Sequence, residues 1–449
     1  MFTKQDLRKL IVPLIIEQIL LVAVGMVDTI MISSVGEAAV SGVSLVDYIN
    51  IWIICIFTAL TTGGGIVAGH CLGKKKKDDA CETAEQLFVF ITIISVIIMV
   101  IVLIGHHWIL TNIFGRIETD VMYNAKMYLL ITAFSIPFIA IYNAGASIFR
   151  AMSDSGTAMV ISMVMNGVNI VGNYIMIYVL GMGVEGAAIP TLISRIFAAI
   201  LITMLLRKDG LEIRLRKGME IKLSARIVKK ICYIGIPNAL ENSVIQFGKI
   251  LVLSLVSSFG TTALAANAVA NNIALFQGIP GNAIGYAMVT VVSQCIGAAR
   301  YDEADYYTKK LLKYMYVGMA LISIPVIILC PILVKAYHLS AATESLTSKI
   351  VIYHAICCMT HWSLAFGLPN ALRAAGDVRI PLVVSLITMW VFRIGFSFIL
   401  GRTLGWGVFG VWVAMTIDWL VRAIFFSIRY KNGKWKRNIF KEQGNTITN

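Results

Sequence analysis

Residues 11–33 read IVPLIIEQILLVAVGMVDTIMIS, an apolar stretch that contains one proline and two acids. A helix that crosses a lipid bilayer needs roughly 20 mostly apolar residues. Eleven more stretches of this kind follow, so the sequence predicts twelve membrane-spanning helices. They cover residues 11–33, 45–70, 84–105, 124–149, 157–180, 186–206, 231–257, 262–296, 311–334, 346–371, 379–401 and 407–429. The eighth is long for one span, and we expect it to begin with a loop or to kink at Pro280.

The composition agrees with a membrane protein. Hydrophobic residues make up 58% of the 449-residue chain, charged residues make up 14%, and the mean hydropathy is +0.82. A soluble domain is about a quarter charged, so this balance excludes one, and it also excludes a disordered chain. The eight cysteines are scattered through apolar stretches and indicate neither a disulfide framework nor a zinc site. The predicted fold class is therefore an all-α polytopic membrane protein.

The basic residues predict how the chain lies in the membrane, because Lys and Arg concentrate in cytoplasmic loops. With the N-terminus in the cytoplasm, the predicted inner segments hold 29 Lys and Arg residues and the outer segments hold five. We expect a multi-pass protein of the cell membrane with both termini in the cytoplasm. The same asymmetry accounts for the net charge of +14. It leaves membrane lipid as the expected surroundings and removes the need for a nucleic-acid partner.

The two halves of the chain repeat one pattern at an offset of about 224 residues. This repeat predicts two pseudo-symmetric lobes of six spans, residues 1–206 and 231–430, related by an axis along the membrane normal. Residues 207–230 then form a cytoplasmic linker, in which Leu223, Ile227 and Ile231 indicate a short surface helix. Residues 431–449 form a cytoplasmic tail. The repeated residues include Pro13, Glu17, Gly36, Cys71 and Gly73, which recur as Pro237, Glu241, Gly260, Cys295 and Gly297.

Polar residues inside apolar helices are the candidates for function. A carboxylate at the centre of a span costs about 2.5–3.5 kcal/mol, and Asp28 lies there in the first span. Glu17 lies eleven positions earlier, about three turns away on the same stripe. Asn166, Asn169 and Asn173 share one face of the fifth span. Amides often join helices by hydrogen bonds, whereas we interpret Asp28 as functional because a carboxylate is costlier to bury.

Other charged side chains in the spans have structural interpretations as well as functional ones. Asp418 and Arg422 are four residues apart on the twelfth span, which predicts an ion pair. Glu241 and Lys249 share the seventh span, where a role specific to the second lobe is open. For two further residues the sequence does not decide between lining a cavity and pairing with a carboxylate. They are Arg195 and Arg393.

Motifs of enzymes and cofactor sites give no support to such functions. The sequence has no Gly-x-x-x-x-Gly-Lys-Ser/Thr string and no His-Glu-x-x-His string. Two Gly-x-Gly-x-x-Gly strings, at 181–186 and 405–410, open predicted membrane helices and do not follow a strand, so they do not indicate a dinucleotide site. We expect neither an enzyme nor a cofactor.

With these residues in view, the chain resembles the multidrug and toxic compound extrusion (MATE) transporters over nearly its whole length. The second-half motifs are most similar to the bacterial DinF-type branch. The resemblance implies the MATE fold, a twelve-helix, two-lobe exporter that exchanges drugs for H⁺ or Na⁺. The motifs that carry it are Pro13-Leu-Ile-Ile-Glu-Gln, Val27-Asp28-Thr29-Ile30-Met31, Val35-Gly36-Glu37-Ala38-Ala39, Gly235-Ile-Pro237, Ser257-Ser-Phe-Gly260, Ala265-Ala-Asn267-Ala and Gln294-Cys-Ile-Gly297.

The resemblance also implies a cation-coupling site in the first lobe. Asp28, Asn169 and Thr191 match the family's residues, whereas Asn173 stands where the family has a second acid. Na⁺ or H⁺ would bind at these four residues, and the loss of one carboxylate favours H⁺. The second-lobe acids of NorM-type members are missing here, which argues against a second cation site.

A mechanism follows from the buried acid. A carboxylic acid in a cavity of low dielectric constant is easier to protonate than one in water. Neutralising Asp28 removes its burial cost, and we expect the first helix to bend at Pro13 and to couple ion binding to drug release. The expected substrates are amphipathic, drug-like organic cations, and we expect a monomer. The alternative function is a lipid-linked oligosaccharide flippase of a related fold, which a large cationic lumen would favour.

Overall fold

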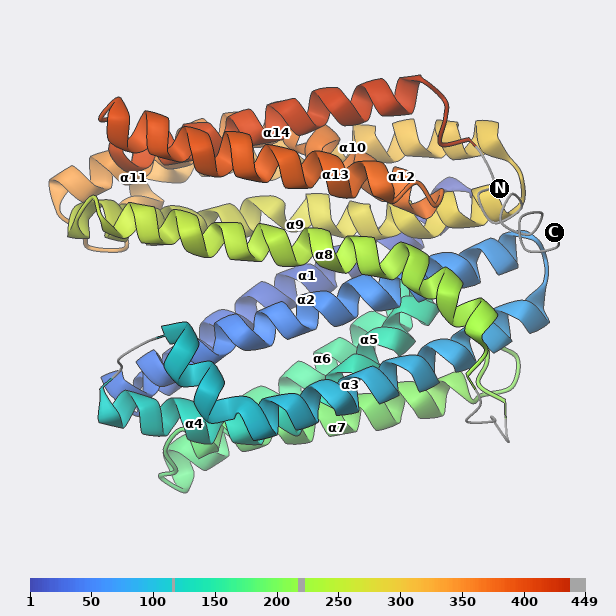
Figure 1. The fold of residues 1–449 in the computed structure, drawn as a ribbon, viewed down its shortest axis with the longest axis horizontal. Helices are drawn as coiled ribbons and strands as arrows, with labels where there is room; N and C mark the ends of the chain where they lie inside the picture. The colour runs from blue at the N-terminus through green and yellow to red at the C-terminus, as the bar shows by residue number, and fades with distance from the viewer. Residues whose placement is uncertain (115–117, 217–222, 437–449) are drawn as a thin grey trace. The chain divides into compact units, whose positions relative to one another are not determined.

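The structure is a computed structural model that describes residues 1–114, 118–216 and 223–436, and within them every regular element is a helix (Figure 1). Eleven helical segments of the described residues are long and apolar enough to cross a membrane. A twelfth span is a helix pair bent by 50° between Ala133 and Ile136. The twelve predicted spans fall on these segments in order, so the predicted fold class is confirmed.

The chain divides into two compact units. The first unit is Lys4–Ala239, and the second is Leu240–Asn449 together with Met1–Thr3. The division falls inside α8 (Ala225–Ser257), which contributes to both. The other elements of the first unit are α1 (Lys4–Ser33), α2 (Glu37–Gly73), α3 (Lys77–Phe114), α4 (Thr119–Ala133), α5 (Ile136–Ala151), α6 (Ser155–Asn173), the π-helical η1 (Tyr174–Val179) and α7 (Glu185–Leu206).

The second unit repeats this order of elements with more π-helical segments. The eleventh membrane span of the chain, Arg379–Thr403, consists for example of three consecutive helical segments. The elements are α9 (Thr261–Gly297), α10 (Tyr301–Lys335), α11 (Ala341–Cys357), η2 (Cys358–Gly367), α12 (Leu368–Ala374), α13 (Arg379–Thr388), η3 (Met389–Gly395), η4 (Ser397–Thr403) and α14 (Gly407–Lys431), where η denotes π-helix.

The second helix of each half lies deepest in its unit. Helix α2 packs against α3, α4 and α5, and α9 packs against α10, α11 and α12. Small residues permit this close packing in a membrane, where backbones approach best without side chains between them. On α2, a Cβ at Gly64 would lie 2.6 Å from the Leu87 side chain, and one at Gly65 would lie 2.3 Å from Ser147 Oγ.

The turns between helices show the internal repeat in their backbone conformation. Four turn positions have a positive φ in both halves, at an offset of 223 or 224 residues. Because this left-handed conformation is uncommon outside glycine, its recurrence at matched positions shows that the two halves share their turn geometry. The pairs are Gly36 with Gly260, Lys75 with Ala299, Ser153 with Gly376, and Gly181 with Gly405.

Two local expectations are wrong. Of the two alternatives for the eighth span, the initial loop is wrong, since α9 runs as one helix over Thr261–Gly297, almost the predicted limits of 262–296, with Pro280 inside it. The linker does not form a separate surface helix in its described part. Ile227 and Ile231 belong to the first turns of α8, and residues 217–222 lie outside the described residues. Residues 213–216 instead pack on the first unit, where the Arg216 amide donates to Glu85 Oε1 at 2.9 Å.

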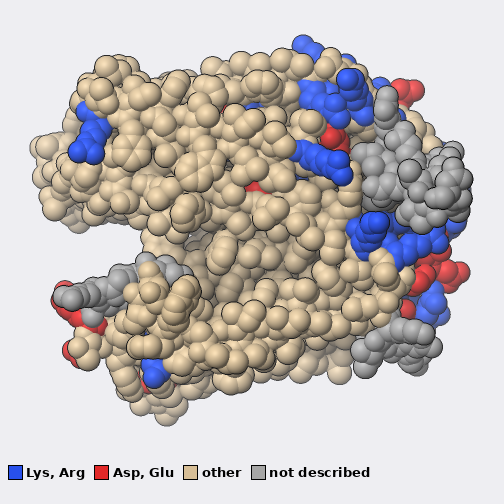
Figure 2. All heavy atoms as spheres, in the orientation of Figure 1, with Lys and Arg blue, Asp and Glu red and all other residues tan. Residues whose placement is uncertain are grey.

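The surface agrees with a chain that spans a bilayer. On the face shown in Figure 2, uncharged side chains cover most of the helix length, and Lys and Arg gather mainly at one end of the helices. The exposed residues 74–77, at the turn between α2 and α3, are lysines of this kind. The orientation of this end toward the cytoplasm stays a prediction, as do the lobe limits 1–206 and 231–430. Residues 437–449 of the predicted tail lie outside the described residues.

Candidate functional site

The first unit brings the four predicted cation-coupling residues together. Asp28 comes from α1, Asn169 and Asn173 from α6, and Thr191 from α7. Asn173 Nδ2 donates to Asp28 Oδ1 at 2.9 Å, and Asn169 Nδ2 lies 3.1 Å from Thr191 Oγ1. Both asparagines are buried, whereas Asp28 and Thr191 are partly buried. A carboxylate in the apolar first span therefore has polar partners on two neighbouring helices.

The amide of Asn169 fits the site in two orientations. In one, Nδ2 donates to Thr191 Oγ1, and the Thr191 hydroxyl donates to Ala187 O at 2.9 Å. With nitrogen and oxygen exchanged, the amide donates to Asp28 Oδ1 at 3.0 Å and to Oδ2 at 3.3 Å. A side-chain amide can thus present either a donor or an acceptor to Asp28. This freedom matters because an ionised and a protonated carboxyl group need different partners.

Local packing brings α6 and α7 together at this site. A Cβ at Gly172 would lie 2.7 Å from Cβ of Pro190, so α6 and α7 approach this closely because residue 172 is glycine. Asn173 follows Gly172 and Thr191 follows Pro190, which places both side chains at the crossing. Helix α6 ends at Asn173 and continues as η1. Helical segments of the π type are frequent at functional sites.

A second group of polar residues adjoins this site, and sequence reasoning missed its acid. Asp47 on α2 is partly buried, and Asn50 and Tyr128 are its hydrogen-bonding neighbours. Tyr128, from α4, is also a neighbour of Thr191. Arg195 on α7 donates to Ser135 Oγ at 2.7 Å and lies within electrostatic reach of both Asp47 and Asp28. Asp47 lies near the start of the second predicted span, where a charged residue is readily interpreted as part of the preceding loop.

The added residues change the charge of the site. When all three groups are ionised, Asp28 and Asp47 contribute two negative charges and Arg195 contributes one positive charge. The combination is one negative charge, which a single proton or sodium ion would neutralise. Arg195, for which the sequence left open a cavity or a carboxylate, thus lies within electrostatic reach of two carboxylates.

Glu17 belongs to a different contact. Its buried carboxylate lies 3.5 Å from the Arg150 guanidinium on α5. The same pair occurs in the second unit, where Arg373 donates to Glu241 Oε2 at 2.7 Å. Arg150 and Arg373 are 223 residues apart, so this ion pair is common to both halves. Lys249 is exposed on α8.

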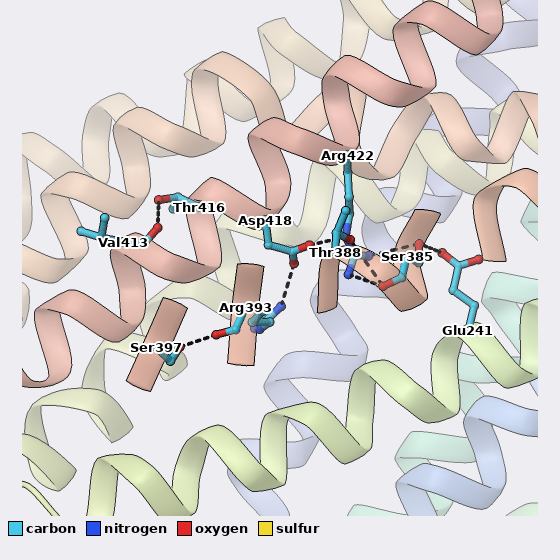
Figure 3. Close-up of polar contacts among 9 residues, drawn as sticks. All are labelled: Glu241, Ser385, Thr388, Arg393, Ser397, Val413, Thr416, Asp418 and Arg422. Atoms are coloured by element: carbon cyan, nitrogen blue, oxygen red, sulfur yellow. Dashed lines mark hydrogen bonds and ion pairs between the residues drawn. The ribbon is translucent and has the colours of Figure 1, made fainter. Parts of the chain in front are cut away.

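The twelfth span contains the predicted ion pair, which is confirmed. Arg422 Nε donates to Asp418 Oδ1 at 2.7 Å, and both side chains are buried (Figure 3). The Arg393 guanidinium lies 3.9 Å from the other carboxylate oxygen of Asp418. These charges form the buried polar network of the second unit.

Comparison with known proteins identifies the class. The MatE family model matches the chain twice, over residues 13–175 and 237–399, and the two matches start at the offset of the internal repeat. The chain belongs to the MATE family of membrane transporters, which are not enzymes. As members of this family are, the protein is a multi-pass membrane protein.

Similar proteins extend over nearly the whole chain. The uncharacterized transporter YisQ of Bacillus subtilis is 26% identical over 94% of this chain and 93% of its own length. The probable multidrug resistance protein NorM of Thermotoga maritima is 25% identical over 97% of this chain and 93% of its own length. A multidrug resistance MATE family transporter in an outward-facing conformation has a TM-score of 0.87 at 21% identity, with 96% of each chain covered.

Two further solved structures show the same fold in two states. A MATE transporter in the bent conformation has a TM-score of 0.88 at 20% identity, with 96% of each chain covered. One in the straight conformation has a TM-score of 0.85 at 21% identity, covering 96% of this chain and 97% of that one.

Proposed function

We propose that the protein is a secondary active multidrug exporter, in which inward movement of H⁺ or Na⁺ through the Asp28 site drives drug efflux. One observation supports the proposal most directly. Asp28 lies within the membrane-spanning helix α1, and its carboxylate is bonded by a side-chain amide of α6. Burying a carboxylate in a span is costly. The cost falls when a cation neutralises it, so cation binding changes which arrangement of α1 is stable.

We infer that the coupling ion is mainly H⁺. Sodium needs several oxygen ligands, and Asn169, Asn173 and Thr191 could supply them only with both amide oxygens turned toward the ion. In the structure, Asn173 presents its nitrogen to Asp28. A proton needs only Asp28 and one acceptor, which Asn169 supplies in one of its two orientations. Na⁺ bound at the same four residues is the alternative.

The moving element would be α1, bent at Pro13. Proline has no N–H, so the carbonyl of Lys9, one turn earlier, loses its usual helical partner. The Ser155 hydroxyl donates to the neighbouring Leu10 O at 2.7 Å and lies 3.4 Å from Lys9 O. This contact stabilises the start of α1 on α6 without fixing the helix beyond it. Solved structures of similar transporters, named as a bent and a straight conformation, support a mechanism with two states.

The substrates would be amphipathic organic cations, handled by a monomer whose termini lie in the cytoplasm. Relatives named as probable multidrug resistance proteins support the export of drugs, a broader class. We assign the chain to the DinF-type branch as part of this proposal, on the similarity of its second-half motifs. A lipid-linked oligosaccharide flippase is less well supported, because Arg195 lies within electrostatic reach of two carboxylates and Arg393 forms a 3.9 Å ion pair with Asp418, which offsets their positive charge.

Transport in proteoliposomes tests the proposal. The wild-type protein should drive efflux of an organic cation when a pH gradient is imposed. Asp28→Asn should fold and bind substrate but lose gradient-driven transport, because an amide does not carry a proton. Asp120→Asn, at an exposed position of α4, is the matched control and should behave as wild type. Efflux by Asp28→Asn at the wild-type rate would contradict the coupling role.

A further inference from the structure

Helices α1 and α6 pack against each other in one register. Near the start of α1, the Ser155 hydroxyl of α6 donates to Leu10 O at 2.7 Å. Further along the same two helices, Asn173 Nδ2 donates to Asp28 Oδ1 at 2.9 Å. Both bonds join residues that are 145 positions apart in the chain. The two helices therefore run parallel, and equal steps along them lead from one contact to the other.

Glu17 and Ser162 are a matched pair between these two contacts. Each lies seven positions after a residue of the first contact, close to two helical turns, and the two are again 145 positions apart. Both side chains are buried. Glu17 Oε2 nevertheless has no hydrogen-bond partner among the described residues, and no hydrogen bond joins the two side chains. The register thus brings a hydroxyl to the level of a carboxylate without bonding the two.

The second unit contains the corresponding residues with the contact closed. Arg373 donates to Glu241 Oε2 at 2.7 Å. Ser385 donates to the other oxygen, Glu241 Oε1, also at 2.7 Å (Figure 3). Each oxygen of this buried carboxylate therefore has a donor of its own.

The two groups of Glu, Arg and Ser occupy matched positions in the internal repeat. Arg373 and Ser385 lie 223 positions after Arg150 and Ser162, and the two glutamates are 224 positions apart. In the first unit, the Arg150 guanidinium is 3.5 Å from one oxygen of the Glu17 carboxylate, and the other oxygen is unbonded. A buried acceptor without a donor is costly. The first unit therefore holds the less satisfied of two arrangements that the same residue types form in one chain.

Pro13 lies between the closed contact of α1 and the open one. The Leu10 contact precedes this proline, whereas Glu17 follows it by about one turn. A bend at Pro13 thus moves Glu17 along α6 while the start of α1 stays attached. We propose that Ser162 is a positioning residue of the transport cycle, whose hydroxyl bonds to Glu17 when α1 takes its second arrangement. This deepens the proposed function, on which it rests, by naming the contact that stabilises α1 once a cation neutralises Asp28.

Thermal unfolding of the full-length protein in detergent tests this contact without transport. Asp28→Asn imitates the neutralised acid and should favour the second arrangement of α1. Ser162→Ala should leave the Tm of the wild-type background unchanged but lower the Tm of the Asp28→Asn background. Asp28 and Glu17 are about 16 Å apart along α1, and mutations at such a distance normally have additive effects. An equal effect of Ser162→Ala in both backgrounds would overturn the proposal.

Ser385→Ala is the matched control, because it removes the same hydroxyl from the closed group of the second unit. It should lower the Tm by the same amount in the wild-type and Asp28→Asn backgrounds, since Ser385 already bonds to Glu241. A fall in the Tm of Ser162→Ala as large as that of Ser385→Ala, in the wild-type background, would also contradict the proposal. It would show that the Ser162 contact is closed from the start.

Efflux from proteoliposomes is the second measurement. Ser162→Ala should lower the maximal rate of gradient-driven efflux by about tenfold, as expected for the loss of a hydrogen bond to a charged group. Substrate affinity should stay within about twofold of wild type. Efflux by Ser162→Ala at the wild-type rate would overturn the positioning role. Efflux by Asp28→Asn at the wild-type rate, with the Tm effects still coupled, would instead contradict the proposed function and support the contact between Ser162 and Glu17.

Discussion

Asn173 determines how the carboxylate of the first unit is held. Its amide donates to Asp28 Oδ1 at 2.9 Å, so the pair is one acid and one neutral donor. A second carboxylate at the same distance could not remain ionised beside Asp28 without a cation between them. Whether residue 173 carries an amide or a carboxylate therefore determines how strongly the site requires a bound cation.

Asn173→Asp is accordingly expected to strengthen Na⁺ binding. The added carboxylate supplies a charged oxygen ligand where the wild-type protein presents an amide nitrogen. Sodium chloride should raise the Tm of this variant more than that of the wild-type protein, with choline chloride as the control for ionic strength. Asn112→Asp, at an exposed position of α3, should respond as wild type. Equal sodium responses in all three proteins would contradict the prediction.

Asp47 and Arg195 should shift the pH dependence of transport in opposite directions. A nearby negative charge favours a proton on Asp28, and a nearby positive charge disfavours it. Asp47→Asn should therefore move the midpoint of proton-driven efflux to lower pH, and Arg195→Gln should move it to higher pH. Each change is expected to be on the order of one pH unit. Efflux measured across a pH series would contradict this account if both variants moved the midpoint the same way.

The sequence predicted Asp28 and its partners for different reasons. Asp28 stood out because its burial cost is visible in a hydropathy pattern, while the importance of Asn169, Asn173 and Thr191 came from the family resemblance. The Glu17–Arg150 contact and the Asp47 group were not predictable in this way. Each depends on which faces of separate helices meet, and a pattern along one chain does not contain that information.

At the scale of elements, glycines determine where helices cross. A Cβ at Gly63 on α2 would lie 2.8 Å from the backbone nitrogen of Gly235 on α8, and one at Gly235 would lie 2.9 Å from Leu60 Cα. Since both contacts are with backbone atoms, neither can be relieved by a change of rotamer. This crossing joins the beginning of α8 to the first unit.

Gly63→Ala should therefore destabilise the protein. The added methyl group forces α2 and α8 apart, and overpacking of this kind typically costs about 1–3 kcal/mol. Gly25→Ala on α1 is the matched control, because a Cβ there meets nothing within 4 Å, and alanine is the better helix former. Thermal unfolding in detergent should give a lower Tm for Gly63→Ala alone. A similar Tm for both variants would show that the crossing is looser than the structure indicates.

At the scale of the whole molecule, the number and order of spans were predictable because a bilayer imposes a minimum length on every crossing helix. The internal repeat was predictable because matched turns keep the same residues and, as the structure shows, the same positive φ at Gly36 and Gly260. The start of α8, inside the segment expected to be the linker, was not. Hydropathy reports where apolar residues lie, whereas α8 begins at Ala225, six residues before the predicted limit, and passes through the polar residues that precede the apolar stretch.

The same charge pattern predicts which side of the membrane each turn faces, and cysteine labelling can test it. Lys76→Cys and Arg216→Cys replace exposed residues on the predicted inner side, and Lys335→Cys and Arg402→Cys replace exposed residues on the predicted outer side. Lys76 is preferable to Lys75, whose φ of 59° would add strain for most substitutes. A membrane-impermeant maleimide should label the outer pair in intact cells and the inner pair only after permeabilisation. The eight native cysteines are buried or partly buried, so the wild-type protein provides the background. Labelling of Lys76→Cys from outside intact cells would reverse the predicted orientation.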